Sequence, residues 1–186
     1  MGAGLMGAAR QDSMLEAAKY SAVETTRDGR RLEIRALTPR DQAGLSTAVD
    51  RSSAQSLYTR FFGAKRSFSD REVDFFLNVD FANHVALVAV VEESGHAAIV
   101  AGGRYIVQKP GTAEIAFLVI DDYQGQGIGA ALLRHLAIVA RDAGLKEFTA
   151  EVLPQNIPML KTFEKSNLKM STKRDAGVVH VALQLC

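Results

Sequence analysis

The sequence predicts an α/β (α+β) domain in which helices flank a mixed, mostly antiparallel central sheet of about six to seven strands. Three observations lead to this fold class. Three apolar runs of strand length follow one another with short turns between them, which is typical of an antiparallel meander. A glycine-rich turn then opens a long segment with apolar residues at helical spacing, and further strand patterns follow that helix.

The length and composition suit a single globular unit. A chain of 186 residues with 47% hydrophobic residues is long enough for one core and too short for two comfortable domains. Residues 1–24 are rich in Gly and Ala and show no strand alternation, so we expect a flexible tail there. A helix over Ser13–Tyr20 is the alternative. Residues 25–186 are then expected to form one domain.

Charge and cysteine content narrow the possible partners. The 22 Lys and Arg residues nearly balance the 21 Asp and Glu residues, so the net charge gives no attraction to nucleic acid or to an anionic membrane. The one cysteine, Cys186, permits neither an intramolecular disulfide nor a thiol-based metal site, and we expect no metal. No apolar run approaches ~20 residues, and the start lacks a signal-peptide pattern, so we expect a cytoplasmic protein.

The sequence pattern of the first part of the domain predicts one strand and several short helices. Leu32, Ile34 and Ala36 alternate with charged residues as in a half-buried strand. Thr38-Pro39 is a typical helix opening, and Ser53–Phe62 and Ser69–Val79 have helical spacing.

The middle of the chain carries the meander. The three apolar runs are Val85–Val91, Ala98–Val107 and Ala113–Ile120. Gly95 and Pro110-Gly111 lie in the intervening turns.

A long helix and the closing elements follow. Apolar residues over Gly127–Ala143 form one stripe that ends at Gly144. We expect a strand over Lys146–Val152, a short helix over Asn156–Ser166, and two final strands within Leu168–Leu185.

The glycine-rich turn is the strongest functional signal. A strand, a polar turn and a helix start place unpaired backbone N–H groups and the positive end of a helix dipole at one point, where phosphate binds. Glycines permit close approach of the ligand, and an apolar residue between them can anchor the first turn in the core. The segment reads Gln124-Gly125-Gln126-Gly127-Ile128-Gly129-Ala130.

Two other phosphate motifs do not match this turn. A P-loop requires Lys followed by Ser or Thr after its last Gly, where Ala130-Ala131 stands here. A Rossmann turn has G-x-G-x-x-G spacing within a βαβ unit, whereas this turn has G-x-G-x-G after a meander. A glycine-rich helix start without a ligand is the remaining alternative.

The turn and its context resemble the GNAT acetyltransferase superfamily. Residues 124–130 after the strand Glu114–Ile120 are similar to its central Q/R-x-x-G-x-G/A motif, and the order of elements agrees from Leu32 to Leu185. The resemblance implies a GNAT fold with acetyl-CoA as cosubstrate and its pyrophosphate on residues 124–130. It also implies that the main chain of Leu118, Val119 and Ile120 contacts the pantetheine arm, because the family's strand is splayed from the next one there.

A narrower resemblance concerns the acceptor. Gln55–Gly63 and Ala113–Phe117 are similar to bacterial protein lysine acetyltransferases that act on acyl-CoA synthetases. The resemblance implies a protein partner of that kind and acetylation of a lysine.

Glu114 is the candidate general base. Acetyl transfer to an amine requires loss of a proton from the ammonium, and Glu114 lies on the strand that leads to the glycine turn. Related lysine acetyltransferases use a glutamate at this place in the motif. A solvent-facing glutamate is the alternative. Glu151 could also line the acceptor cleft, although an exposed strand position is the simpler interpretation. Exposure is also the simpler interpretation for His135, and His84 receives no role.

The residue at the position of the family's general acid differs from the family pattern. Many members carry an Asn and, seven positions later, a Tyr whose hydroxyl lies near the CoA sulfur. Asn156 fits this pattern, but Phe163 replaces the tyrosine. A thiol pKa of about 8.5 permits the thiolate to leave unaided or with a water.

The leading hypothesis is an N-acetyltransferase that acts on a protein lysine by direct attack in a ternary complex. The alternatives are an acetyltransferase for a small amine and a non-catalytic acetyl-CoA sensor. An acidic acceptor pocket would favour the first alternative, and a buried, paired Glu114 would favour the second.

Overall fold

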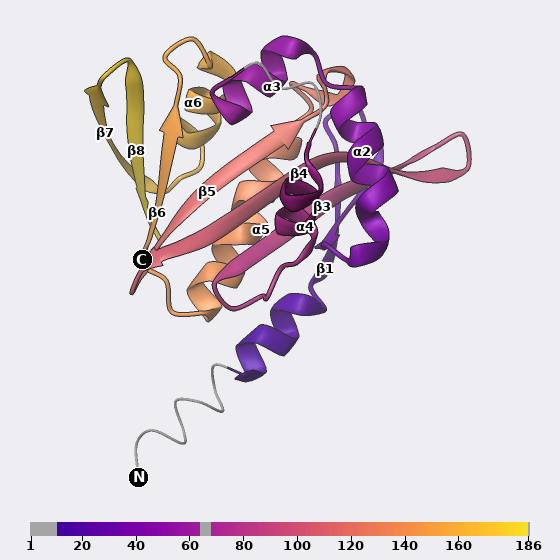
Figure 1. Cartoon of the computed structure of the whole chain (residues 1–186), viewed down its shortest axis with the longest axis horizontal. Helices are drawn as coiled ribbons and strands as arrows, with labels where there is room; N and C mark the ends of the chain where they lie inside the picture. The colour runs from indigo at the N-terminus through magenta and orange to yellow at the C-terminus, as the bar shows by residue number, and fades with distance from the viewer. Residues whose placement is uncertain (1–10, 64–67, 186) are drawn as a thin grey trace.

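The computed structural model describes residues 11–63 and 68–185. One sheet of eight strands forms its centre, in the order β1-β2-β3-β4-β5-β6-β8-β7 (Figure 1). The strands are β1 (Ser21–Thr25), β2 (Arg31–Ala36), β3 (His84–Glu93), β4 (His96–Lys109), β5 (Thr112–Val119), β6 (Glu147–Val152), β7 (Lys169–Asp175) and β8 (Val178–Gln184). Every neighbouring pair is antiparallel except β5 and β6, which run parallel.

Helices cover both faces of this sheet. Figure 1 shows α5 behind the sheet and α2 and α4 in front of it. The helices are α2 (Gln42–Asp50), α3 (Ala54–Phe61), α4 (Asp70–Leu77), α5 (Ile128–Asp142) and α6 (Ile157–Glu164), with short 3-10 turns η1 (Pro39–Asp41) and η2 (Asp121–Tyr123). The predicted fold class and its meander, β3-β4-β5, are therefore confirmed.

The sheet begins earlier in the chain than the sequence predicts. Residues 11–18 are helical, and Ser21–Thr25 pairs with β2 as an edge strand, so this part of the expected tail is ordered structure. Sequence periodicity misses β1 because its side chains are exposed or half-buried and show no apolar alternation. The rest of the expected tail, residues 1–10, lies outside the described residues.

His135 on α5 holds the edge strand in place. Its Nε2 lies 2.6 Å from Glu24 Oε1, and its Nδ1 lies 2.5 Å from the Tyr20 hydroxyl. The expectation that His135 is exposed is therefore wrong, because only 7% of it is accessible. A buried imidazole is stable here because both ring nitrogens have partners.

The parallel strands β5 and β6 separate along their length. Their pairing extends only from Thr112 opposite Glu147 to Glu114 opposite Thr149. Beyond Glu114, β5 remains paired with β4 as far as Val119 but no longer with β6, and Figure 1 shows the two strands diverging. This separation opens a cleft in the middle of the sheet.

Candidate active site

The main cleft lies between the diverging ends of β5 and β6 and has a volume of about 870 Å³. The N-terminus of α5, the helix α3 and the helix α6 border it. Most residues predicted for the site line it, namely Glu114, Leu118, Val119, Gln124, Gly125, Gly127, Ile128, Gly129, Ala130, Asn156 and Phe163.

Two predicted residues do not line the main cleft. The Ile120 side chain is fully buried and its N–H donates to the Val100 carbonyl at 3.0 Å. Gln126 contributes its carbonyl to the Arg27 N–H at 3.2 Å. Contact of the Leu118, Val119 and Ile120 main chain with a pantetheine arm stays a prediction.

The glycine turn has a backbone conformation that favours glycine at two positions. Gly125 and Gly127 have φ values of +75° and +88°, which side-chain-bearing residues rarely adopt. Gly129 has an ordinary φ, and a Cβ added there would meet only Val119 and Thr162 at ordinary contact distances of 3.8 and 3.9 Å. Ile128 is buried, as predicted, and anchors the first turn of α5 in the core.

Gln124 connects this turn to its surroundings. Its side-chain amide donates to the Val119 carbonyl and to Ser56 Oγ, both at 3.1 Å. The turn is therefore linked to the end of β5 and to α3, which borders the main cleft.

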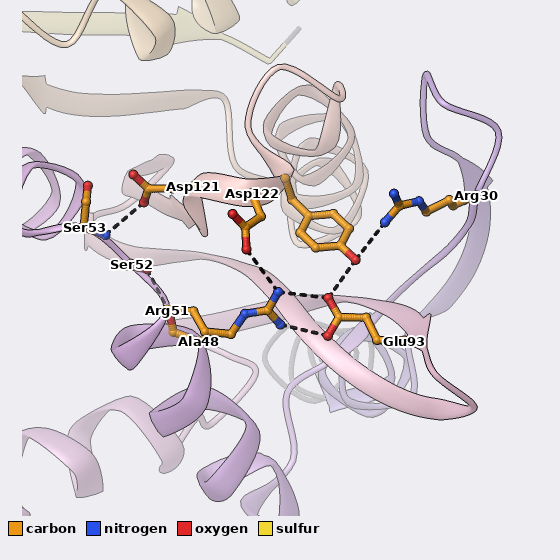
Figure 2. A network of polar contacts seen from close by, with 9 residues as sticks. Arg30, Ala48, Arg51, Ser52, Ser53, Glu93, Asp121 and Asp122 are labelled. Atoms are coloured by element: carbon orange, nitrogen blue, oxygen red, sulfur yellow. Dashed lines mark hydrogen bonds and ion pairs between the residues drawn. The ribbon is translucent and has the colours of Figure 1, made fainter.

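A polar network holds the segment that precedes the turn (Figure 2). Arg51 donates two hydrogen bonds of 2.9 Å to Glu93, and Tyr123 donates one of 2.7 Å to the same carboxylate. Arg30 donates to the Tyr123 hydroxyl at 2.9 Å. The hydrogen bonds from Arg51 and Tyr123 lower the pKa of the Glu93 carboxyl. The network joins four segments that are distant in sequence, and it fixes the position of η2.

Arg27 is a site residue that the sequence analysis missed. Its guanidinium donates to the Gly125 carbonyl at 3.1 Å, and its Nε lies 3.7 Å from the position a Cβ would take on Gly127. The side chain is exposed and lines the main cleft beside the glycine turn. A cation at this place adds to the positive end of the α5 dipole. No local pattern indicates this residue, because only the fold brings the β1–β2 loop to the turn.

Glu114 lies where β5 and β6 part. It is exposed and accepts a hydrogen bond of 3.1 Å from the Gln108 side chain. It borders both the main cleft and a side groove of about 320 Å³ that also contains Thr149, Glu151 and His180. Glu151 Oε1 lies 3.5 Å from His180 Nδ1. Glu114 can therefore be approached from the cleft and from the groove.

The α6 side of the cleft contains no phenol. Asn156 caps α6, accepting a hydrogen bond of 3.3 Å from the Met159 N–H. Phe163 is buried and packs against Phe117 with ring centroids 6.2 Å apart.

In the part of the chain that the structure describes, no group of three or more His, Cys, Asp or Glu residues could hold a metal ion. Across residues 11–63 and 68–185, no helix has the length and apolar character to cross a membrane.

Comparisons with known proteins agree with this geometry. Residues 51–167 match the model of the Acetyltransferase (GNAT) family. The acetyltransferase PA5475 of Pseudomonas aeruginosa is 35% identical over 126 residues, which are 67% of this chain and 68% of that protein. The acetyltransferase Pat of Mycolicibacterium smegmatis is 30% identical over 155 residues, or 82% of this chain, and the match spans 45% of Pat.

A solved structure shows the same fold. The GNAT domain of S. lividans PAT superposes with a TM-score of 0.80 at 34% identity, covering 88% of this chain and 96% of that domain. The cleft at the splayed strands, the glycine turn at the start of α5 and these matches all lead to one assignment. The chain belongs to the GNAT acetyltransferase family and is an acyltransferase that uses acetyl-CoA.

Proposed function

We propose that this protein transfers the acetyl group of acetyl-CoA to a lysine side chain of a protein in the cytoplasm, by direct attack within a ternary complex. An acyl-CoA synthetase is the substrate class that the similarity of Gln55–Gly63 and Ala113–Phe117 implies. Two of the relatives bear the name Pat, for protein acetyltransferase, which supports a protein acceptor.

The position of Glu114 is the observation that carries the proposal. Its carboxylate is exposed at the boundary of the main cleft and the side groove. A lysine side chain entering through the groove would therefore meet a carboxylate just before the cleft that takes the thioester. The sensor alternative loses support, because a buried and paired Glu114 would favour a sensor and this carboxylate is exposed.

The chemistry requires few groups. Glu114 takes a proton from the ammonium, and the neutral amine nitrogen attacks the thioester carbonyl carbon. A C–N bond forms, the C–S bond breaks, and CoA leaves as a thiolate, which is acceptable for a thiol of pKa about 8.5. The thiolate takes the second proton that the nitrogen loses, so that the products are the amide and CoA thiol. Two parts of the chain hold the cosubstrate. The main chain near Leu118 and Val119 contacts the pantetheine arm, and the turn over residues 124–130 binds the pyrophosphate.

An acetyltransferase for a small amine is the second candidate. Glu114 and Glu151 both border the side groove, and carboxylates attract any protonated amine. Lys173 lies in the same groove, however, and its positive charge would repel a small amine with several positive charges.

The experiment offers acetyl-CoA with one of two acceptors, a purified acyl-CoA synthetase or a polyamine. Mass spectrometry of the synthetase is expected to show one acetylated lysine, whose acetylation is strongly slowed with Glu114→Gln. Rapid consumption of the polyamine without any protein acetylation would replace the first candidate by the second.

A further inference from the structure

A second cavity lies on the other side of β5 from α5, bordered by α2, α3 and α4 and by β4 and β5. Its volume is about 330 Å³, and its walls are mainly apolar. Leu45, Val49, Phe61, Phe76 and Ile99 supply much of this surface. We call it the inner cavity.

Two arginines line the inner cavity. The Arg60 guanidinium lies over the Phe61 ring at 4.7 Å, and that of Arg104 lies over the Phe76 ring at 4.6 Å. Both residues are half-buried. Among the described residues, neither guanidinium is within 4 Å of a carboxylate, since every ion pair found there involves other residues.

The surroundings of Arg104 do not neutralise its charge. Its Nη1 donates to His84 Nε2 at 2.9 Å, and its Nη2 donates to the Phe76 carbonyl at 3.4 Å. His84 is a neutral acceptor, because burial and the nearby guanidinium lower its pKa to about 4. Burial and the charge of Arg60 lower the pKa of Arg104 to about 9, so that both arginines stay protonated at neutral pH.

Acidic groups near the inner cavity lie at its margins. Asp50 lines it but is exposed to solvent, and Glu114 acts on Arg60 only through its charge. Two like charges beside a mainly apolar cavity repel each other, and a ligand carboxylate would reduce that repulsion. An Arg guanidinium is also well suited to bind carboxylates through paired hydrogen bonds.

The inner cavity adjoins the main cleft. Arg60, Phe61, Ala116 and Leu118 line both. Glu114, Ala116 and Leu118 alternate along β5 and share one face of it. A chain attached to the reacting carbonyl beside Glu114 could therefore extend past Ala116 toward the two arginines.

We propose that the inner cavity binds a short chain that ends in a carboxylate, which sits between Arg60 and Arg104. The source we favour is the acyl group of a donor such as succinyl-CoA, so that the enzyme also transfers carboxyacyl groups. The other source of the same chemistry is a carboxylate on the amine acceptor. The proposal rests on the acyltransferase function proposed above.

The additional transfer needs no new reagent. Glu114 takes a proton from the ammonium, and the neutral amine nitrogen attacks the thioester carbonyl. The C–N bond forms, the C–S bond breaks, and CoA leaves as a thiolate that takes the second proton of the nitrogen. The distal carboxylate takes no part in bond making and only positions the donor.

Calorimetric titration with acetyl-CoA, butyryl-CoA and succinyl-CoA tests the site without requiring turnover. Wild-type protein should bind succinyl-CoA at least about tenfold more tightly than butyryl-CoA, as a charge-assisted hydrogen bond implies. Arg104→Gln should remove this preference, and Arg104→Lys should retain part of it. Arg71→Gln, a change at an exposed arginine of α4 outside both cavities, is the matched control and should retain all of it.

A second variant protects the test against misfolding. Val49→Phe fills the inner cavity without removing a charge and should reduce succinyl-CoA binding while acetyl-CoA still binds.

A separate experiment tests the amine acceptor as the source of the carboxylate. It compares free lysine with 1,5-diaminopentane, using acetyl-CoA as donor. An Arg104-dependent preference for lysine would support the same site with the acceptor as source.

The outcomes distinguish the carboxylate-binding proposal from the proposed acetyltransferase function. Equal binding of succinyl-CoA and butyryl-CoA, together with no Arg104-dependent preference among acceptors, would overturn it even if acetyl transfer is intact. Absence of all acyl transfer would contradict the proposed function, while the titrations would still decide whether the cavity binds a carboxylate.

Discussion

The Tyr123 hydroxyl donates a 2.7 Å hydrogen bond to Glu93, and this contact ties the segment before the glycine turn to the end of β3. Tyr123→Phe should lower stability by about 2 kcal/mol, because the hydroxyl also accepts a hydrogen bond from Arg30 and the variant loses both bonds; the corresponding fall in Tm is roughly 4–8 °C. Because Arg51 still pairs with Glu93, the fold should persist. Acetyl-CoA binding is expected to weaken, since the turn loses one restraint. Thermal unfolding and titration with acetyl-CoA measure both effects, and an unchanged Tm would show that the contact carries no net energy.

Gly129 permits a cleaner test of the phosphate site than Gly127. A side chain at Gly127 is strained at φ +88°, whereas one at Gly129 has room. Gly129→Ala should stabilise α5 by up to about 1 kcal/mol. Gly129→Asp should retain stability, because an acidic residue is favourable at a helix N-terminus, but should abolish CoA binding by repelling the pyrophosphate. Normal CoA binding by a folded Gly129→Asp protein would show that the phosphate lies elsewhere.

Arg27 is expected to strengthen CoA binding from outside the family motif. Arg27→Gln should raise the Kd for CoA about tenfold, corresponding to one charge-assisted contact. Its Tm should change little, since the side chain is exposed. Arg31→Gln, at another exposed arginine nearby, is the control. Comparison of CoA with dephospho-CoA identifies which phosphate Arg27 contacts: an effect lost with dephospho-CoA indicates the 3′-phosphate, and one that persists indicates the pyrophosphate.

Glu114→Gln keeps the shape of the side chain but removes the proton acceptor. Transfer should slow by about 10²–10⁴-fold, while CoA binding stays normal. The rate of the variant should depend more steeply on high pH, where the amine deprotonates without help. Glu151→Gln is the matched control on the neighbouring strand. If Glu114→Gln retains the wild-type rate at neutral pH and Glu151→Gln does not, Glu151 is the base.

His84 should make stability depend on pH. Its pKa is about 4 in the folded protein and about 6.5 in an unfolded chain, so between these values only the unfolded state takes up the proton. Its contribution is complete above about pH 6.5 and is lost as the pH falls toward 4, by roughly 3 kcal/mol in total. Urea unfolding at several pH values should show a weaker pH dependence in His84→Gln than in the exposed-residue control His96→Gln. Parallel curves for the two variants would contradict the assigned shift.

Local patterns predicted most of the fold. The meander β3-β4-β5 and the helix α5 follow from apolar periodicity, which depends only on residues near one another in the chain. The glycine turn is predictable for the same reason, because positive φ values at Gly125 and Gly127 are a local backbone requirement. The edge strand β1 escaped prediction because it is held by contacts such as that of Glu24 with His135, which are 111 positions apart.

The composition of the candidate site was only partly predictable. Residues on β5 and in the turn are contiguous in sequence, so one motif indicates them together. Arg27 reaches the turn across 98 positions, and no spacing rule connects the two.

The inner cavity shows what only the tertiary structure decides. An arginine in a sequence is expected to face solvent, because burying its charge is costly. Nothing in the residues around Arg60 or Arg104 indicates otherwise. Only the packing of α2, α3 and α4 on β4 and β5 places both guanidinium groups beside the same cavity. Sequence therefore determines which elements form and where phosphate is expected, whereas burial and the meeting of distant charges depend on how those elements pack.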